Sequence, residues 1–384
     1  NLLVDGWKYS DYNLNTIELN GFISDDAFVE YVEIPDYYNN KKIESYSYNA
    51  FSDTKIKTFK FNKYIKHLEA SSFVNCIDLY KIELNDNFTS IPDSAFFFTS
   101  SLSSISIPNS VNEIKTSAFA SSGLKSITIP ASVKKIETGS FSNSNIEKII
   151  FEDGISEIKA GSFKEMPYLQ ELYIPKSVTN IEYNAFGDST QINNISIDSD
   201  NPKYVNINNS QTIVDKDKNE LLYAGENSII PESITSIAPY SLASINEYII
   251  PNHITTLKDY ALYNCPLAII PNSIKNIESS SAFYINDNKY TDTYYFVHKD
   301  SFVHNYLATN NLPYLLLESE KIELDLKKSD YNAFEKISYD DFYMSIVYSG
   351  SENKEFAINL NSFPYVYPSI LYQNETDHFV AGDE

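Results

Sequence analysis

The chain has 384 residues, 42% of them hydrophobic, and a formal net charge of −23. This charge excludes nucleic acids and anionic membranes as partners, because both attract basic surfaces. All 29 cationic residues are lysine, so the bidentate arginine contact to phosphate or carboxylate is absent, and no apolar run reaches the roughly 20 residues of a membrane helix.

The first 27 residues precede the periodic part of the chain and are predicted to form an N-terminal cap. The sequence starts at Asn1 and not at methionine, which is typical of a trimmed mature region. A signal peptide and an anchor are not present in this chain, and their absence decides nothing about the location of the protein.

A large apolar residue recurs at nearly constant spacing from residue 28 onward. The steps are 22 or 23 residues up to residue 186, and 20 or 21 residues after a gap. Self-similarity at this period predicts a solenoid of stacked turns. The recurring residues, called pegs below, are Phe28, Phe51, Phe73, Phe96, Phe119, Phe141, Phe163, Phe186, Leu242, Leu262 and Phe283.

Each repeat also carries a fixed apolar pattern before its peg. In "LKSITIPASVKKIETGSF" (Leu124–Phe141), the alternation Ile127–Thr128–Ile129 predicts a short strand with one buried face, which Pro130 ends. Val133 and Ile136 predict a second short inward-facing segment. No unit can bury its own apolar face, so neighbouring turns must stack to form one core.

The repeat is interrupted between residues 186 and 242. Two strands are predicted at Thr212–Val214 and Leu221–Tyr223, joined by a polar turn from Asp215 to Glu220. We expect an inserted β-hairpin within about residues 198–228.

The same segment allows a second interpretation as a calcium loop. Asp215, Asp217, Asn219 and Glu226 occupy positions 1, 3, 5 and 12 of such a loop. However, Glu220 stands at position 6, where glycine is needed, and the flanks favour strands over helices. The solvated hairpin tip is the favoured interpretation, and calcium binding is the alternative.

After the last peg, "YFVHKDSFVHNYLATNNLPY" (Tyr295–Tyr314) differs from the repeats and predicts a closing segment at about residues 291–317. The period then disappears. Short alternating segments such as "YMSIVYSG" and "KEFAINL" predict a small β-rich C-terminal module or cap over residues 318–384.

The segments "ISIPNSVNEIKTSAF" (Ile105–Phe119) and "LYIPKSVTNIEYNAF" (Leu172–Phe186) resemble the consensus of the BspA-type leucine-rich repeat family, and the closing segment resembles the C-terminal end of its repeats. The resemblance covers about residues 28–317. It implies a leucine-rich repeat solenoid that is mainly β with short irregular or 3-10 segments, wound as a right-handed superhelix. It also implies export, display on a cell surface and a role in adhesion, with partners that vary among members.

The sequence contains no pattern of catalytic, cofactor or metal-ligating residues beyond the calcium alternative. The five histidines fit no zinc spacing, and no serine nucleophile elbow or glycine-rich phosphate loop is present. Cys76 and Cys265 follow pegs on distant turns and are predicted to be buried free thiols. We therefore expect a non-enzymatic protein.

The outward-facing positions of the predicted strands form two columns along the solenoid. Ile150 and Tyr173 stand on neighbouring strands of one column, and exposed apolar residues on a sheet mark an interaction patch. The alternatives are that bulky residues simply favour strands, or that the inserted hairpin covers them. For Ile249, covering is favoured. The partner-binding candidates are Tyr31, Thr128, Ile150, Glu171, Tyr173 and Ile249.

Three functions compete on this evidence. The first is an adhesin-like, virulence-associated binding protein that presents its repeat face to a host matrix protein, a cell-surface protein or a surface glycan. The second is a passive spacer that projects another domain. The third is an enzyme whose chemistry lies in the tail or in missing sequence, and no motif supports it. A monomer is favoured.

Overall fold

The structure is a computed structural model, which describes residues 7–11, 13–22, 30–226, 228–245, 247–286, 294–326, 342–348 and 356–359. It divides into two compact units, Asn1–Asn206 and Ile207–Glu384. The boundary lies inside the predicted insertion. The peg Phe28 and most of the predicted C-terminal module lie outside the described residues.

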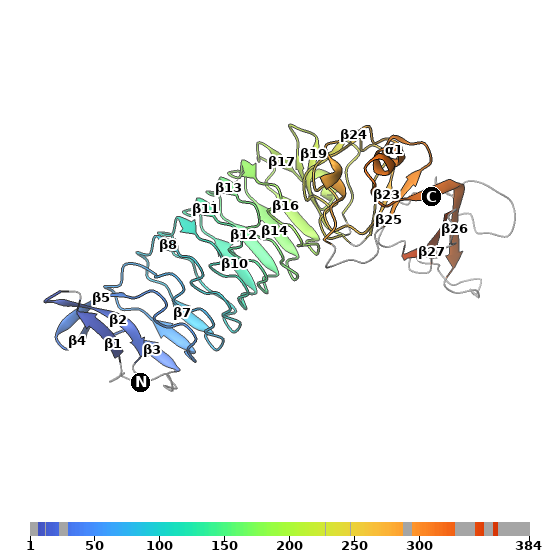
Figure 1. The fold of residues 1–384 in the computed structure, drawn as a ribbon. Coiled ribbons are helices and arrows are strands. Elements are labelled where there is room, and N and C mark those ends of the chain that lie inside the picture. Colours follow the sequence, from blue (N-terminus) through green and yellow to red (C-terminus); the bar gives the residue numbers. More distant parts are fainter. Residues whose placement is uncertain are drawn as a thin grey trace, which may run out of the picture. The chain divides into compact units, whose positions relative to one another are not determined.

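The first unit opens with a sheet and continues as a solenoid, whose turns follow one another from β3 to β16 (Figure 1). The opening sheet has the order β1 (Trp7–Asp11), β2 (Thr16–Phe22), β5 (Lys41–Tyr46) and β4 (Tyr37–Tyr38). It contains part of the predicted cap and also strands from the first repeat. Four further sheets belong to this unit. Two are built from the first strands of the repeats: β3 (Tyr31–Glu33), β6 (Thr58–Lys60) and β7 (Lys81–Glu83) in one, and β10 (Ser126–Ile129), β12 (Lys148–Phe151), β14 (Glu171–Ile174) and β16 (Asn194–Ile197) in the other. The other two are built from the second short strands: β8 (Ser90–Ile91), β9 (Glu113–Ile114) and β11 (Lys135–Ile136) in one, and β13 (Glu157–Ile158) and β15 (Asn180–Ile181) in the other.

The longer strands confirm the predicted inward and outward alternation. β10 pairs in parallel with β12, and β12 with β14, so that Ile127, Ile149 and Leu172 lie side by side in the core. Thr128 and Ile150 pair on the opposite face. One predicted strand does not form: residues 102–108 join no ladder, so this turn separates the sheet of β3, β6 and β7 from the sheet of β10, β12, β14 and β16, while β9 on the same turn still pairs with β8 and β11.

The pegs of the first unit form a continuous aromatic stack in the core, which we call the Phe ladder. Neighbouring rings are nearly parallel, with centroids 5.2–5.6 Å apart and interplanar angles of 3–22°. The spacing exceeds the roughly 4.8 Å between strands only slightly, so one ring per turn matches the rise of the stack. The ladder consists of Phe51, Phe73, Phe96, Phe119, Phe141, Phe163 and Phe186.

Each ladder phenylalanine lies between two residues with left-handed backbone. They occupy the positions two before and two after the peg, as in Asn49 and Asp53 around Phe51. Glycine, asparagine and aspartate tolerate this conformation best, which explains Gly139 and Gly161 at the first position. The peg turn is therefore specified locally, and the amide of Phe73 donates to the carbonyl of Ala95 on the next turn at 2.9 Å.

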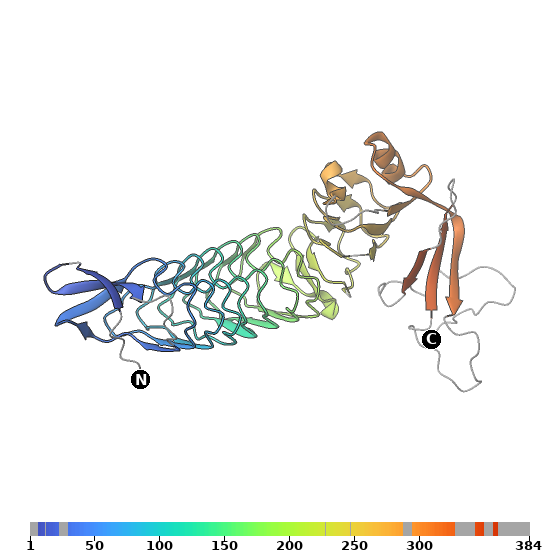
Figure 2. The same ribbon diagram turned by 60° about the horizontal axis from the view of Figure 1, so that its bottom comes forward.

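The second unit contains shorter turns and the closing segment, and Figure 2 shows its α1 from another side. In the described residues, helix is confined to α1 (Phe302–Thr309), which Ser301 caps, and to the short segments η1 (Ile207–Asn209) and η2 (Ser280–Phe283). The remaining strands are β17 (Tyr204–Val205), which ends the first unit, and β18 (Thr212–Asp215), β19 (Glu220–Ala224), β20 (Ser236–Ile237), β21 (Glu247–Ile249), β22 (Thr256–Leu257), β23 (Leu267–Ile270), β24 (Asn276–Ile277), β25 (Tyr294–His298), β26 (Leu315–Leu326), β27 (Phe342–Tyr348) and β28 (Phe356–Asn359).

The polar turn predicted from Asp215 to Glu220 is shorter than expected. β18 and β19 pair antiparallel, and both of these acidic residues belong to the strands. Each is buried, with 2% of Asp215 and none of Glu220 exposed, so neither belongs to a solvated tip. The carboxylate of Glu220 forms an ion pair with Lys258, which follows β22, and β20 lies between β19 and β22 in the sheet.

Candidate protein-binding surface

Four of the predicted site residues lie on one parallel sheet of the first unit. Thr128, Ile150 and Tyr173 stand in register on β10, β12 and β14, and Glu171 lies at the start of β14. Strand pairing places them together, since a parallel in-register ladder brings equal repeat positions to adjacent rungs. The other two predicted residues lie elsewhere: Tyr31 is exposed on β3, in a different sheet, and Ile249 belongs to the second unit.

Charged and hydroxyl groups surround the apolar pair Ile150 and Tyr173. Glu171 forms an ion pair with Lys148, at 2.6 Å between Oε2 and Nζ. The hydroxyl of Tyr173 donates to Asp198 at 3.2 Å, and partial burial together with the Asp198 carboxylate raises the pKa of this phenol. The hydroxyl of Tyr173 thus fixes the position of its ring, while the apolar side chain of Ile150 is 37% exposed.

Ile249 has a more enclosed position than Ile150. It is half-buried and pairs with Ile269 on β23, which in turn pairs with Phe296 on β25. Phe296 is fully buried although it occupies the same outward column. Bulky apolar residues in this part of the second unit therefore contribute to packing, and covering of Ile249 by the inserted hairpin stays a prediction.

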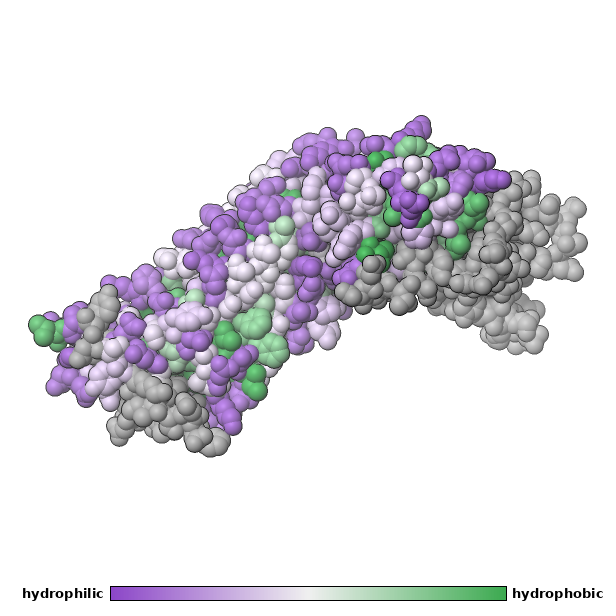
Figure 3. Space-filling model, in the orientation of Figure 1, coloured by the Kyte–Doolittle hydropathy of each residue, from purple (hydrophilic) through white to green (hydrophobic). Residues whose placement is uncertain are grey.

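The structure also shows an exposed apolar cluster that the sequence analysis missed. Ile77, Tyr80 and Phe98 expose 49%, 48% and 47% of their surface on two successive turns next to β7. Apolar residues gather on this part of the surface (Figure 3). We call these three residues the Phe98 cluster.

Phe98 is unusual in its backbone as well as its exposure. It occupies the left-handed position after the peg, with φ at 61°, where Asn75 and Asn143 stand on other turns. A bulky residue at this conformation is strained by about 1–3 kcal/mol, and the half-exposed ring of Phe98 recovers only part of that through its tilted contact with Phe97, at 5.9 Å between ring centroids. Alignment of the peg turns would have revealed this phenylalanine at an asparagine position.

The four residues of the calcium alternative do not form a metal site in the described part of the chain. An oxygen of Asp215 accepts hydrogen bonds from the amides of Asp217 and Lys218, at 3.1 and 3.3 Å, and so stabilises its own turn. Asn219 has a left-handed backbone at the end of that turn. Across the described residues, no three His, Cys, Asp or Glu side chains converge as metal ligands would.

Both cysteines are free and buried, as predicted. Burial raises the pKa of the Cys76 thiol to about 11, so at neutral pH the reactive thiolate is scarce. The thiol of Cys76 lies 3.1 Å from the carbonyl oxygen of Phe51 on the preceding turn, which is a packing position.

The repeat pattern matches the family model of the BspA type leucine rich repeat region in three overlapping segments, residues 9–123, 89–212 and 200–291. The chain belongs to the BspA-type leucine-rich repeat family. No curated protein matches the chain.

Two solved structures of leucine-rich repeat proteins are similar to this chain. One comes from Bacteroides ovatus, with 20% sequence identity and a TM-score of 0.51 over 77% of this chain and 70% of that one. The other is a leucine rich cell surface protein from Faecalibacterium prausnitzii, also with 20% identity and a TM-score of 0.51, over 73% of this chain and 76% of that one. At this identity the likeness shows the fold alone. No helix within the described residues has the length and apolar character needed to cross a membrane.

Proposed function

We propose that this chain is a non-enzymatic, adhesin-like protein of the cell surface that binds a protein partner through exposed apolar residues of its first unit. The Phe98 cluster carries this proposal. A strained backbone that displays an aromatic ring to water reduces stability, and such strain concentrates where function requires it. Aromatic residues also dominate binding energy at protein interfaces.

The sheet face around Ile150 and Tyr173 supports the proposal as a second contact region. Its core is apolar, and the Lys148–Glu171 pair provides a polar rim, which is the usual anatomy of a protein interface. Location at the cell surface, adhesion to host or neighbouring cells and a role in virulence belong to the same proposal. They are supported by the family and by the cell-surface designation of the Faecalibacterium protein.

Binding to immobilised matrix proteins and to intact host cells tests the proposal. Phe98→Asn removes the exposed ring and installs the residue that this backbone favours, so it should keep the fold and weaken binding by about tenfold or more, as for an interface hot spot. Tyr48→Ser is the matched control and should bind normally. Tyr48 is an aromatic residue that is 65% exposed, and it precedes its peg, Phe51, whereas Phe98 follows its own.

A paired substitution tests the sheet face separately. The double variant Ile150→Ser and Tyr173→Ser should fold cooperatively and weaken the same partner. If the Phe98→Asn, Ile150→Ser and Tyr173→Ser variants all bind as the unchanged protein does, recognition by this unit is wrong and the passive spacer is the better description.

A further inference from the structure

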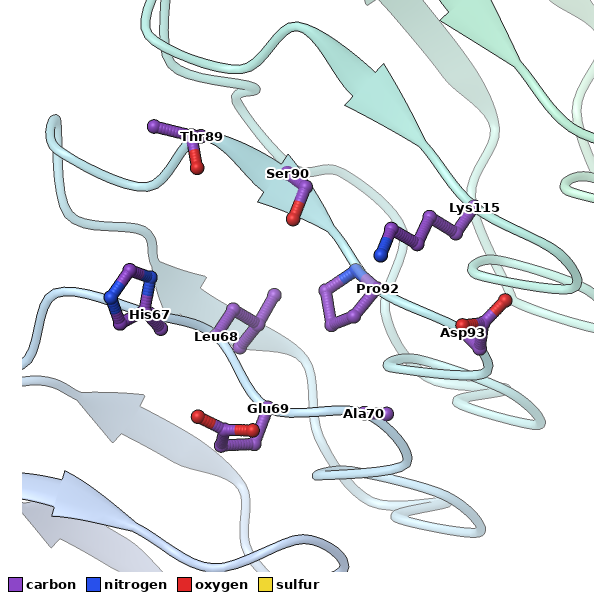
Figure 4. A pocket seen from close by; sticks show the side chains of 9 residues that line it. All are labelled: His67, Leu68, Glu69, Ala70, Thr89, Ser90, Pro92, Asp93 and Lys115. Carbon is purple, nitrogen blue, oxygen red and sulfur yellow. The ribbon is translucent and has the colours of Figure 1, made fainter.

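A polar cavity of about 300 Å³ opens between two consecutive turns of the first unit, one from residues 67 to 70 and the other from residues 89 to 93. Figure 4 shows the hydroxyls of Thr89 and Ser90 directed toward the opposite turn, while Lys115 extends its ammonium group past Pro92. The polar lining consists of His67, Glu69, Thr89, Ser90, Asp93 and Lys115.

The cavity exists because a backbone ladder is missing at this point. On other turns of this unit, the amide that follows the second short strand donates to the preceding turn at 2.9 Å: Lys115 to Ile91, Glu137 to Ile114 and Glu182 to Ile158. The equivalent residue here is Pro92, which has no N–H. The carbonyl of Leu68 therefore loses its expected donor.

A second substitution removes the alternative donor. Between two later turns the hydrogen bond from this backbone N–H is also absent, but there the hydroxyl of Ser162 donates to the carbonyl of Ile136 at 3.1 Å. The residue at the equivalent position beside the cavity is Ala95. Within the described residues, the Leu68 carbonyl thus accepts no hydrogen bond, and beyond this gap the two turns are joined again by the bond from the Ser71 amide to the Asp93 carbonyl, at 2.9 Å.

The side chains around the cavity also lack the pairing seen along the rest of this surface. On the following turns Lys135 pairs with both Glu113 and Glu137, and Lys159 with Glu157 and Glu182. Within the described residues, none of the six polar side chains of the cavity forms a hydrogen bond or ion pair. Donors and acceptors are therefore available on both walls.

We propose that this cavity binds a neutral sugar unit of a glycan, a site that goes beyond the protein-binding surface described above. The two carboxylates Glu69 and Asp93 disfavour an anion, and the Lys115 ammonium disfavours a cation. A pyranose ring carries hydroxyls that donate to the carboxylates and to the Leu68 carbonyl while they accept from Lys115, Ser90 and Thr89.

Size and surroundings fit this ligand class. A volume near 300 Å³ lies at the lower end of small-ligand pockets, which span about 300–1,000 Å³. Partial burial raises the pKa of the Glu69 carboxyl, which shows that this acceptor is partly removed from water, where hydrogen bonds strengthen. Buried Leu68 and Pro92 contribute apolar surface for the C–H face of a sugar ring.

The experiment uses saturation-transfer NMR and calorimetry with four probes, the methyl glycosides of glucose, galactose, mannose and N-acetylglucosamine. We expect at least one to bind with a Kd of the order of 1 mM. Pro92→Ala restores an N–H that can donate to the Leu68 carbonyl, so it should close the gap, protect amide 92 from hydrogen exchange and weaken the sugar by about tenfold or more.

A second variant keeps the gap open. The double substitution Thr89→Ala and Ser90→Ala removes two hydroxyls and should weaken the sugar while Pro92, and with it the gap, stays in place, whereas the control Pro130→Ala, at the end of β10, should leave binding unchanged. The proposal is wrong if none of the four glycosides binds, if binding survives both cavity variants, or if acetate or putrescine binds there and the sugars do not. The protein-binding surface would stand in each case, because its test uses other residues.

Discussion

The two units solve the same packing problem with different side chains. In the first, seven phenylalanines stack in the core; in the second, two of the three pegs are Leu242 and Leu262, on turns one to three residues shorter. Aromatic stacking there moves outward to the left-handed positions, where the rings of Tyr240 and Tyr260 lie 5.1 Å apart at 7°. The difference teaches that a turn requires a large apolar peg, while a continuous ring stack is an addition that longer turns accommodate.

The units also hold their charges differently. The ion pairs of the first unit, such as Lys135 with Glu113, involve exposed or half-exposed side chains, while Glu220 in the second unit is fully buried beside Lys258. An exposed pair contributes little, about 0–1 kcal/mol, whereas a broken buried pair leaves an uncompensated charge in the core. The second unit therefore depends on a polar contact in a way that the first does not.

The largest expected effect comes from removal of a ladder ring. Phe119→Ala should lower the free energy of unfolding by about 3–5 kcal/mol, because it leaves a cavity between Phe96 and Phe141. Phe119→Leu keeps a peg and loses only the stacking, so it should cost less, about 1–3 kcal/mol for two aromatic pairs. Urea denaturation measures both. A cost near zero for Phe119→Leu would show that the stack itself contributes nothing.

Breaking the buried ion pair should have a similar or slightly smaller effect. Lys258→Met should destabilise the second unit by about 3–5 kcal/mol at neutral pH, since it removes the closest cation of the buried Glu220 carboxylate, whose ion pair with Lys218 is longer, at 4.0 Å. The matched substitution Lys135→Met in the first unit should cost at most about 1 kcal/mol. Native-state hydrogen exchange reports each unit separately, and a small loss at Lys258 would contradict the contrast in charge burial.

These first two comparisons separate what the sequence could predict from what it could not. The pegs, the strand alternation and the two free thiols followed from the period, because a repeat places like residues in like environments. Burial of Asp215 and Glu220 did not follow, since the partner Lys258 lies 38 residues beyond Glu220 and reaches it only through stacking. The missing strand at residues 102–108 was equally invisible, because that copy fits the repeat pattern.

A smaller effect of opposite sign is expected at Phe98. Phe98→Asn should raise the free energy of unfolding by about 1 kcal/mol, because asparagine adopts the left-handed backbone with less strain and the exposed ring has little packing to lose. Thermal unfolding beside the control Tyr48→Ser measures the gain. A clear loss of stability would mean that the ring serves the fold, and the binding proposal would lose its main support.

The smallest net effect is expected for the equivalent strain in the second unit. Tyr260→Asn relieves a left-handed tyrosine, with φ at 57°, but loses the stack on Tyr240 and the edge contacts with Tyr263 and Tyr284. Strain relief of about 1–3 kcal/mol and three aromatic contacts worth about 0.5–1.5 kcal/mol each are of similar size, so stability should change by less than about 1 kcal/mol. Urea denaturation measures this change. It decides whether the ring contacts of Tyr260 offset its backbone strain, which the contacts of the Phe98 ring do not.

Sequence alone determined the repeat length, the identity of the pegs and which face of each strand turns inward, because side-chain periodicity and chain-local turn preferences are written residue by residue. Only the tertiary structure decided which outward residues meet, where a charge is enclosed and where two turns fail to join. Those outcomes depend on hydrogen bonds between turns more than 20 residues apart. The single proline at residue 92 illustrates this: its missing N–H is plain in the sequence, but the carbonyl that it leaves without a donor belongs to the turn before.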